Sequence, residues 1–110
     1  MNQAFDALAA DLEWTDLPAE KCPEGILDTG VTTLGDSAFV DVGVWAHPRG
    51  RSTDVEQDEV FVVIEGSGCV VLPDGSELAL RPGVVGFLTA GTSTTWIVDE
   101  PLRKVWITPH

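Results

Sequence analysis

Short apolar runs, each ended by glycine or proline, follow one another along the chain from about residue 25 onward. They fall at roughly 25–33, 38–47, 59–65, 68–73, 77–81, 85–89, 93–98 and 103–108. Turn residues that recur every ~8–12 positions between short strands are typical of antiparallel sandwiches and barrels. The pattern therefore predicts an all-β fold.

The N-terminal segment has a different period. Its apolar residues recur at helical spacing, at Phe5, Leu8, Ala9 and Leu12. Asn2 is placed to cap a helix, so we expect a short amphipathic helix over residues 3–13. A chain of 110 residues has room for one domain. The predicted organisation is an N-terminal helix and arm over 1–17 and a single barrel domain over 18–110.

Two stretches in the middle of the chain have their own patterns. The polar stretch HPRGRSTDVEQD, residues 47–58, predicts either a surface connection or the rim of a pocket. The stretch from Asp58 to Gly75 predicts a hairpin with a Gly66-Ser67-Gly68 turn, followed by a Pro73-Asp74-Gly75 turn.

Charge and composition exclude several classes of function. Eighteen acidic against six basic residues give a formal net charge of −12, and there is no basic stripe for nucleic acid or anionic lipid. No stretch approaches the ~20 apolar residues of a membrane span, and the N-terminus lacks the basic start of a signal peptide. We expect a cytoplasmic protein in which Cys22 and Cys69 are reduced, buried or half-buried thiols.

Several ordered motifs resemble the cupin superfamily, most closely its small single-domain branch related to (S)-ureidoglycine aminohydrolase, the cupin_3 or DUF861-like group. A glutamate, six residues and a glycine stand at Glu59-VFVVIE-Gly66. Both glycines of the second cupin motif follow in Gly83-VVGFL-Thr89-Ala90-Gly91, with threonine in place of proline. Gly43-Val44-Trp45, Trp96 and the segment Glu100-Pro101-Leu102-Arg103-Lys104 with Trp106 also match the small branch.

The resemblance implies a double-stranded β-helix, a jelly-roll-like antiparallel barrel, over about residues 38–108. It does not carry over the usual metal site. The histidines of metal-binding cupins would fall on Thr53 and Val55, or on Ser52 and Asp54 with a longer spacer, and the last one near Thr94. None of these is histidine, and neither His47 nor His110 matches the motif. We predict no cofactor, and a divalent metal held by Glu59 with Asp54 or Glu56 stays open as an alternative.

Strand alternation then predicts which side chains share the barrel interior. If Glu59 points inward, Phe61 and Val63 share its face and Asp58 points outward. Thr94 with Trp96, and Lys104 with Trp106, would face inward from later strands. Glu59 and Lys104 are therefore the candidate catalytic pair, an acid or base with a charge partner that could also hold an anionic substrate. The candidate substrate-binding residues are Trp45, Arg51, Phe61, Thr94, Trp96 and Trp106.

Two functions of different classes fit this set. The first is an enzyme, a hydrolase, lyase or isomerase, that acts on a small polar nitrogenous or carboxylate compound. The second is a non-catalytic cupin that binds or senses a small molecule. The tryptophans either form walls for a ligand or simply fill the barrel, as side chains do in small barrels. We expect a homodimer, as is common among cupin barrels, with Trp14 packed on the barrel or on a partner subunit.

Overall fold

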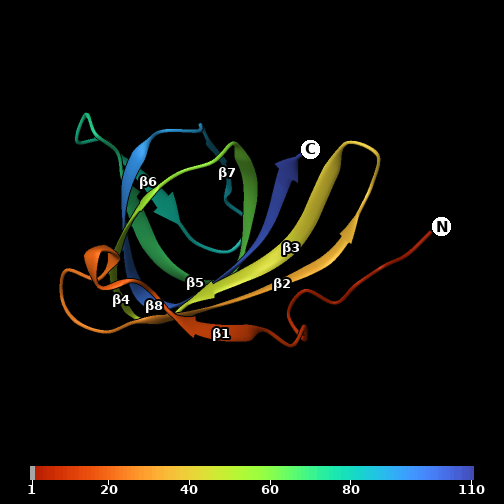
Figure 1. Cartoon of the computed structure of the whole chain (residues 1–110), viewed down its shortest axis with the longest axis horizontal. Coiled ribbons are helices and arrows are strands. Elements are labelled where there is room, and N and C mark those ends of the chain that lie inside the picture. The colour runs from red at the N-terminus through yellow and green to blue at the C-terminus, as the bar shows by residue number, and fades with distance from the viewer. Residues whose placement is uncertain (1) are drawn as a thin grey trace.

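The computed structural model describes residues 2–110, and within this range it contains eight β-strands and one short 3-10 helix (Figure 1). The strands are β1 (Glu13–Asp16), β2 (Asp28–Asp36), β3 (Val40–His47), β4 (Gly50–Val55), β5 (Glu59–Val71), β6 (Glu77–Leu80), β7 (Val85–Leu88) and β8 (Ser93–Pro109). The helix η1 covers Ala19–Lys21. The all-β fold is confirmed.

Two long strands organise the barrel. β5 and β8 pair with each other along most of their length, in an antiparallel register from Val60↔Ile107 to Val71↔Thr95. Each then pairs with two further strands, β5 with β7 and β6, and β8 with β3 and β4. β2 and β1 extend the sheet beyond β3. Figure 1 shows the sheet curling around an interior, with the C-terminal end of β8 near the β2–β3 hairpin.

The predicted turn at Gly66-Ser67-Gly68 is wrong, because the chain continues through it as strand β5. The register between β5 and β8 shifts at Glu65, Ser67 and Gly68, which marks a bulge rather than a reversal. Glycine is needed here for close approach: a Cβ atom at Gly66 would lie 2.1 Å from the Pro101 carbonyl oxygen. After Glu59 the chain first reverses its direction at the predicted Pro73-Asp74-Gly75 turn, where Gly75 has a φ of +86°.

The polar stretch over residues 47–58 is not all loop. Residues 50–55 form β4, which pairs with β8 from Gly50↔Val98 to Val55↔Ser93. The strand lacks an apolar face because its inward residues Ser52 and Asp54 line a cavity instead of the core. Sequence periodicity identifies strands by apolar alternation, so it missed this one.

The helix predicted over residues 3–13 is also wrong. The structure has only a turn at residues 7–9, where Asp6 Oδ1 accepts hydrogen bonds from the backbone N–H groups of Leu8 and Ala9. The Arg103 guanidinium bonds the carbonyl oxygens of Ala7 and Ala10, at 3.0 and 3.1 Å. A helix of this length is marginal in water without a packed face, and here the carbonyl groups have another partner.

The arm continues into β1, which adds an edge strand to β2. Trp14 lies on β1 and covers Gly30, where a Cβ atom would be 2.8 Å from the indole ring. Trp14 thus packs on the barrel, which is one of the two predicted alternatives. About half of its surface (49%) stays exposed. The domain division at residue 17 stays a prediction.

The core lies between β5 and the other barrel strands. It consists of Phe61, Val63, Val70, Leu80, Leu88, Trp96, Val98 and Leu102. Both cysteines are free, Cys22 buried and Cys69 half-buried, as expected. In residues 2–110 no helix is long and apolar enough to cross a membrane.

Candidate functional site

One end of the barrel holds a cavity of about 370 Å³. It is lined by Leu17, Lys21, Val31, Trp45, Ser52, Thr53, Asp54, Glu56, Gln57, Glu59, Trp96, Lys104, Trp106 and Thr108. These residues come mainly from β3, β4, β5 and β8, whose inward positions meet here. Five members of the predicted site line the cavity: Trp45, Glu59, Trp96, Lys104 and Trp106.

Glu59 and Lys104 form an ion pair inside the cavity. Lys104 Nζ donates to Glu59 Oε2 at 2.5 Å. The side chain of Lys104 is 6% exposed and that of Glu59 is 16% exposed. Register explains the contact, because Lys104 lies opposite Val63 on β5, on the same face of that strand as Glu59. The predicted inward facing of both residues therefore matches the structure.

Aromatic rings surround the Lys104 ammonium group. Its Nζ atom lies 4.7 Å from the ring centroids of Trp45 and Trp96 and 5.0 Å from that of Phe61. A cation at this distance from an aromatic face is attracted by the ring quadrupole. The rings also fix each other, since the Trp45 and Trp96 centroids are 5.2 Å apart in an edge-to-face arrangement.

Glu56 is a second buried carboxylate in the cavity wall, 7% exposed. Its Oε1 atom accepts hydrogen bonds from Thr94 Oγ1 at 2.7 Å and from Trp96 Nε1 at 3.0 Å. The sequence pointed to Glu56 only as a metal ligand in an alternative. Its position in a polar stretch with no apolar alternation gave no signal that it is buried.

The other predicted site residues lie outside the cavity lining. Phe61 is fully buried beneath Lys104, and Thr94 is buried and holds Glu56. Arg51 is exposed on β4 and lies with Arg49 beside Ile26 and Leu27, away from the cavity. Arg51 therefore lies outside the candidate site, contrary to the expectation that it contacts a substrate.

His47 lies behind the cavity wall and is 1% exposed. A carbonyl oxygen only accepts, so the 2.6 Å contact to Pro48 O means that Nδ1 carries the proton. Nε2 then accepts from Ser52 Oγ at 2.9 Å. Burial lowers the pKa of His47 below its ordinary value of 6.5, and the hydrogen bond to Pro48 offsets part of that effect. As a neutral imidazole, His47 thus holds the Ser52 hydroxyl group in place.

We predict that this histidine makes the protein less stable in mild acid. Its pKa is lower in the folded than in the unfolded chain, so its stabilisation is present above about pH 6.5 and is lost as pH falls toward the folded pKa. Between pH 7.5 and 5.5, urea unfolding should show a larger loss of stability for the wild type than for His47→Gln. His110→Gln, which changes an exposed histidine, serves as the control. Equal pH slopes for wild type and His47→Gln would contradict the prediction.

The positions that the resemblance assigns to metal ligands are now defined. Ser52 and Asp54 lie opposite the buried residues Trp96 and Thr94 of β8, while Val55 is 59% exposed, so the longer spacer is the matching one. Asp54 is held by Lys21 at 3.0 Å. Ser52, Asp54, Glu59 and Thr94 offer no imidazole, so they do not fit a typical cupin transition-metal site.

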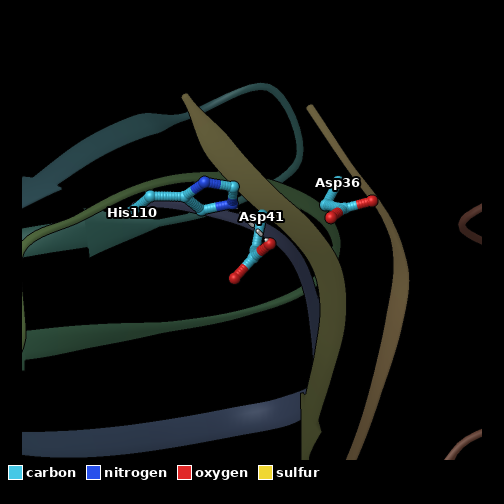
Figure 2. Close-up of side chains that lie close together, drawn as sticks. All are labelled: Asp36, Asp41 and His110. Atoms are coloured by element: carbon cyan, nitrogen blue, oxygen red, sulfur yellow. Dashed lines mark hydrogen bonds and ion pairs between the residues drawn. The ribbon is translucent and has the colours of Figure 1, made fainter. Parts of the chain in front are cut away.

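The described chain brings three potential metal-ligating residues together at one place, outside the cavity. Figure 2 shows Asp36, Asp41 and His110 at the ends of neighbouring strands, with one ligand atom from each within 4.8 Å of the others. His110 Nε2 lies 2.9 Å from Asp41 Oδ1. All three are exposed or half-exposed, and an ion pair accounts for the His110 contact.

Comparison with known proteins places the fold. A family model for EutQ-like cupin domains matches residues 34–106, which is most of the chain. The chain belongs to the EutQ-like cupin family. The match covers the barrel from the end of β2 to Trp106 and so includes Trp45, Glu59 and Lys104. A comparison with curated protein sequences gave no match.

Solved structures support the same fold for this EutQ-like cupin. EutQ from Clostridium difficile is 16% identical over 86% of this chain and 79% of its own, with a TM-score of 0.67. A DUF861-family protein of unknown function from Pseudomonas syringae is 20% identical, with a TM-score of 0.76 over 90% of this chain and 44% of its own. The polyketide cyclase RemF from Streptomyces resistomycificus is 20% identical, with a TM-score of 0.69 over 99% of this chain and 80% of its own.

Proposed function

We propose that the barrel cavity binds and transforms a small polar metabolite, a nitrogenous or carboxylate compound, with Glu59 as general acid or base and Lys104 as its charge partner. The observation that carries the proposal is the buried Lys104–Glu59 pair, which opens onto a cavity large enough for a small molecule. The polyketide cyclase RemF is an example of this fold around chemistry on an organic molecule, although at 20% identity only the fold is shared.

A purely structural role explains the pair less well. Desolvating two charges costs several kcal/mol per ion, and well-packed apolar residues in their place are often as stabilising. A paired carboxylate and ammonium that line a cavity are instead ready to exchange a proton with a ligand, or to compensate charge that develops on it. Trp45, Trp96 and Trp106 would hold the flat or apolar part of the ligand.

We expect Glu59→Gln to keep ligand binding and to lose turnover. Ligands would be sought by incubating the purified protein with a fractionated metabolite extract and following bound and changed masses. For a compound that the wild type transforms, loss of a general acid or base should lower kcat by about 100-fold or more. The exposed residue Glu65 lies on the same strand, so Glu65→Gln is the matched control. Undiminished kcat in Glu59→Gln would show that Glu59 is not the acid or base.

A non-catalytic binding protein is the second candidate, and the missing histidine ligands favour it. In that case a ligand would be recovered unchanged after long incubation with the wild type. Elemental mass spectrometry of untagged protein purified without chelator tests the third, carboxylate-based metal alternative. A metal at one equivalent per chain that disappears in Glu59→Gln but not in His110→Gln would place it in the cavity.

The homodimer also stays a prediction. Several large apolar residues are exposed on the monomer, among them Ile26, Phe39, Val85 and Phe87, each more than half exposed. Exposed apolar groups of this size often mark an interface. The helix predicted over residues 3–13 is not formed, so these exposed side chains are the apolar surface that supports the prediction.

A further inference from the structure

The charges that line the cavity do not cancel. Five ionisable side chains line it: Lys21, Asp54, Glu56, Glu59 and Lys104. Lys21 pairs with Asp54 and Lys104 pairs with Glu59. Among the residues described, Glu56 has no cationic partner. Its two donors, Thr94 and Trp96, are neutral, so one buried negative charge lacks a counter-charge.

The Glu56 carboxylate is held in one orientation. The backbone N–H of Glu56 donates to Thr92 O at 2.9 Å, and the backbone carbonyl oxygen of Glu56 accepts from Gly91 N at 2.8 Å. These two bonds fix the main chain of Glu56 beside the start of β8. Both side-chain donors bind the same oxygen, Oε1. No fully occluded side-chain oxygen in residues 2–110 lacks a hydrogen-bond partner. Glu56 lines the cavity, and its Oε2 atom accepts no hydrogen bond from the described residues and is not fully occluded.

We propose that Glu56 Oε2 binds the charged nitrogen of a small organic ammonium ion, so that the cavity selects cationic nitrogen compounds over carboxylates. The inference rests on the proposed function of the cavity and narrows its substrate class. An N–H group of such an ion supplies both the missing counter-charge and the missing hydrogen bond, and hydrogen bonds between charged groups are the stronger kind.

The remainder of the cavity agrees with this selection. The rings of Trp45 and Trp96 already contact the Lys104 ammonium group, so the Trp106 ring would offer the aromatic surface that attracts a ligand cation and tolerates apolar substituents. An anionic ligand would meet two ammonium groups that are already engaged by Asp54 and Glu59, and it would lie beside the unpaired charge of Glu56. A neutral ligand would leave that charge uncompensated.

A series of probes of nearly equal size tests the charge preference: benzylammonium, benzyl alcohol and benzoate. Binding would be followed through the four tryptophan indole N–H resonances, one of which belongs to the Trp96 N–H that donates to Glu56. We expect benzylammonium to bind the wild type at least about tenfold more tightly than benzyl alcohol, and benzoate more weakly than either. Glu56→Gln, which can still accept both hydrogen bonds, should remove the preference, while Glu65→Gln should keep it.

The outcomes separate this inference from the proposed function. Equal binding of all three probes, or a preference that survives in Glu56→Gln, would overturn the ammonium assignment and leave the Glu59 proposal standing. If no probe shifts any cavity indole, the ammonium assignment is overturned, and the metabolite screen with Glu59→Gln decides the proposed function separately. Loss of a stoichiometric metal from Glu56→Gln would show that the counter-ion is a metal and overturn the assignment. The wild-type series alone decides the matter if Glu56→Gln does not fold.

Discussion

Replacement of Lys104 by methionine is expected to lower the free energy of unfolding by about 3–5 kcal/mol, because it leaves the largely buried Glu59 carboxylate without its partner. The side chain of Glu59 is 16% exposed, and its only protein hydrogen bond on the described chain is to Lys104. Methionine preserves most of the apolar stem of Lys104. The lost charge, rather than lost packing, would therefore dominate the effect, which urea unfolding at pH 7 measures.

Two further variants complete this test. Lys21→Met breaks the exposed pair with Asp54, whose side chains are 39% and 43% exposed, and should cost less than about 1 kcal/mol. The double variant Glu59→Leu with Lys104→Met removes both buried charges and should return to within about 1 kcal/mol of the wild type. A loss of less than about 1 kcal/mol for Lys104→Met alone would mean that Glu59 is effectively hydrated in the folded protein.

The double variant also bears on why the pair exists. If it is as stable as the wild type but no longer binds or transforms a ligand, the two charges are not needed for the fold. An ion pair that gives no stability advantage has another role, and its place in the cavity wall indicates that this role is to act on a ligand. If the double variant remains destabilised, the pair has a structural role as well.

Strand alternation correctly predicted which side chains face inward around Glu59. Because successive side chains on a strand point to opposite faces, placing Glu59 inward fixed Phe61 and Val63 as core residues, and both are fully buried. The same reasoning placed Lys104 and Trp106 on the cavity side of β8. These strands have apolar residues on their inner faces, so the period of two is visible in the sequence.

The parts that sequence reasoning missed are those where polar residues face inward or where a strand bends without ending. β4 places Ser52 and Asp54 toward the cavity, so it has no apolar stripe, and the adjoining Glu56 could not be recognised as buried. Gly66 and Gly68 resemble turn residues, yet they allow β5 to bulge against the backbone of β8. Both errors come from long-range pairing with β8, which local patterns do not contain.

Gly86→Ala is expected to destabilise the protein by about 3 kcal/mol through overpacking. Gly86 on β7 lies opposite Phe61 on β5, and an added Cβ atom would stand 2.2 Å from Phe61 Cζ and 2.3 Å from Cε2. The Phe61 ring has little room to move, because it is fully buried and packs against Trp96, with centroids 5.8 Å apart. The matched control is Gly35→Ala, whose Cβ would meet its nearest atom at 3.5 Å, and which should change stability by less than about 0.5 kcal/mol.

The same substitution also tests how the Phe61 ring supports the ion pair. The Phe61 ring centroid lies 5.0 Å from Lys104 Nζ, so a methyl group that displaces the ring would disturb its contact with the ion pair. In a Phe61→Leu background the ring atoms that clash are gone, and Gly86→Ala should cost at least about 1 kcal/mol less than in the wild type. That coupling, measured by urea unfolding of the four proteins in the cycle, would show that the glycine provides space for the ring. Additive effects would instead mean that the cost of Gly86→Ala arises in the β7 backbone, and the position of Lys104 would then not depend on residue 86.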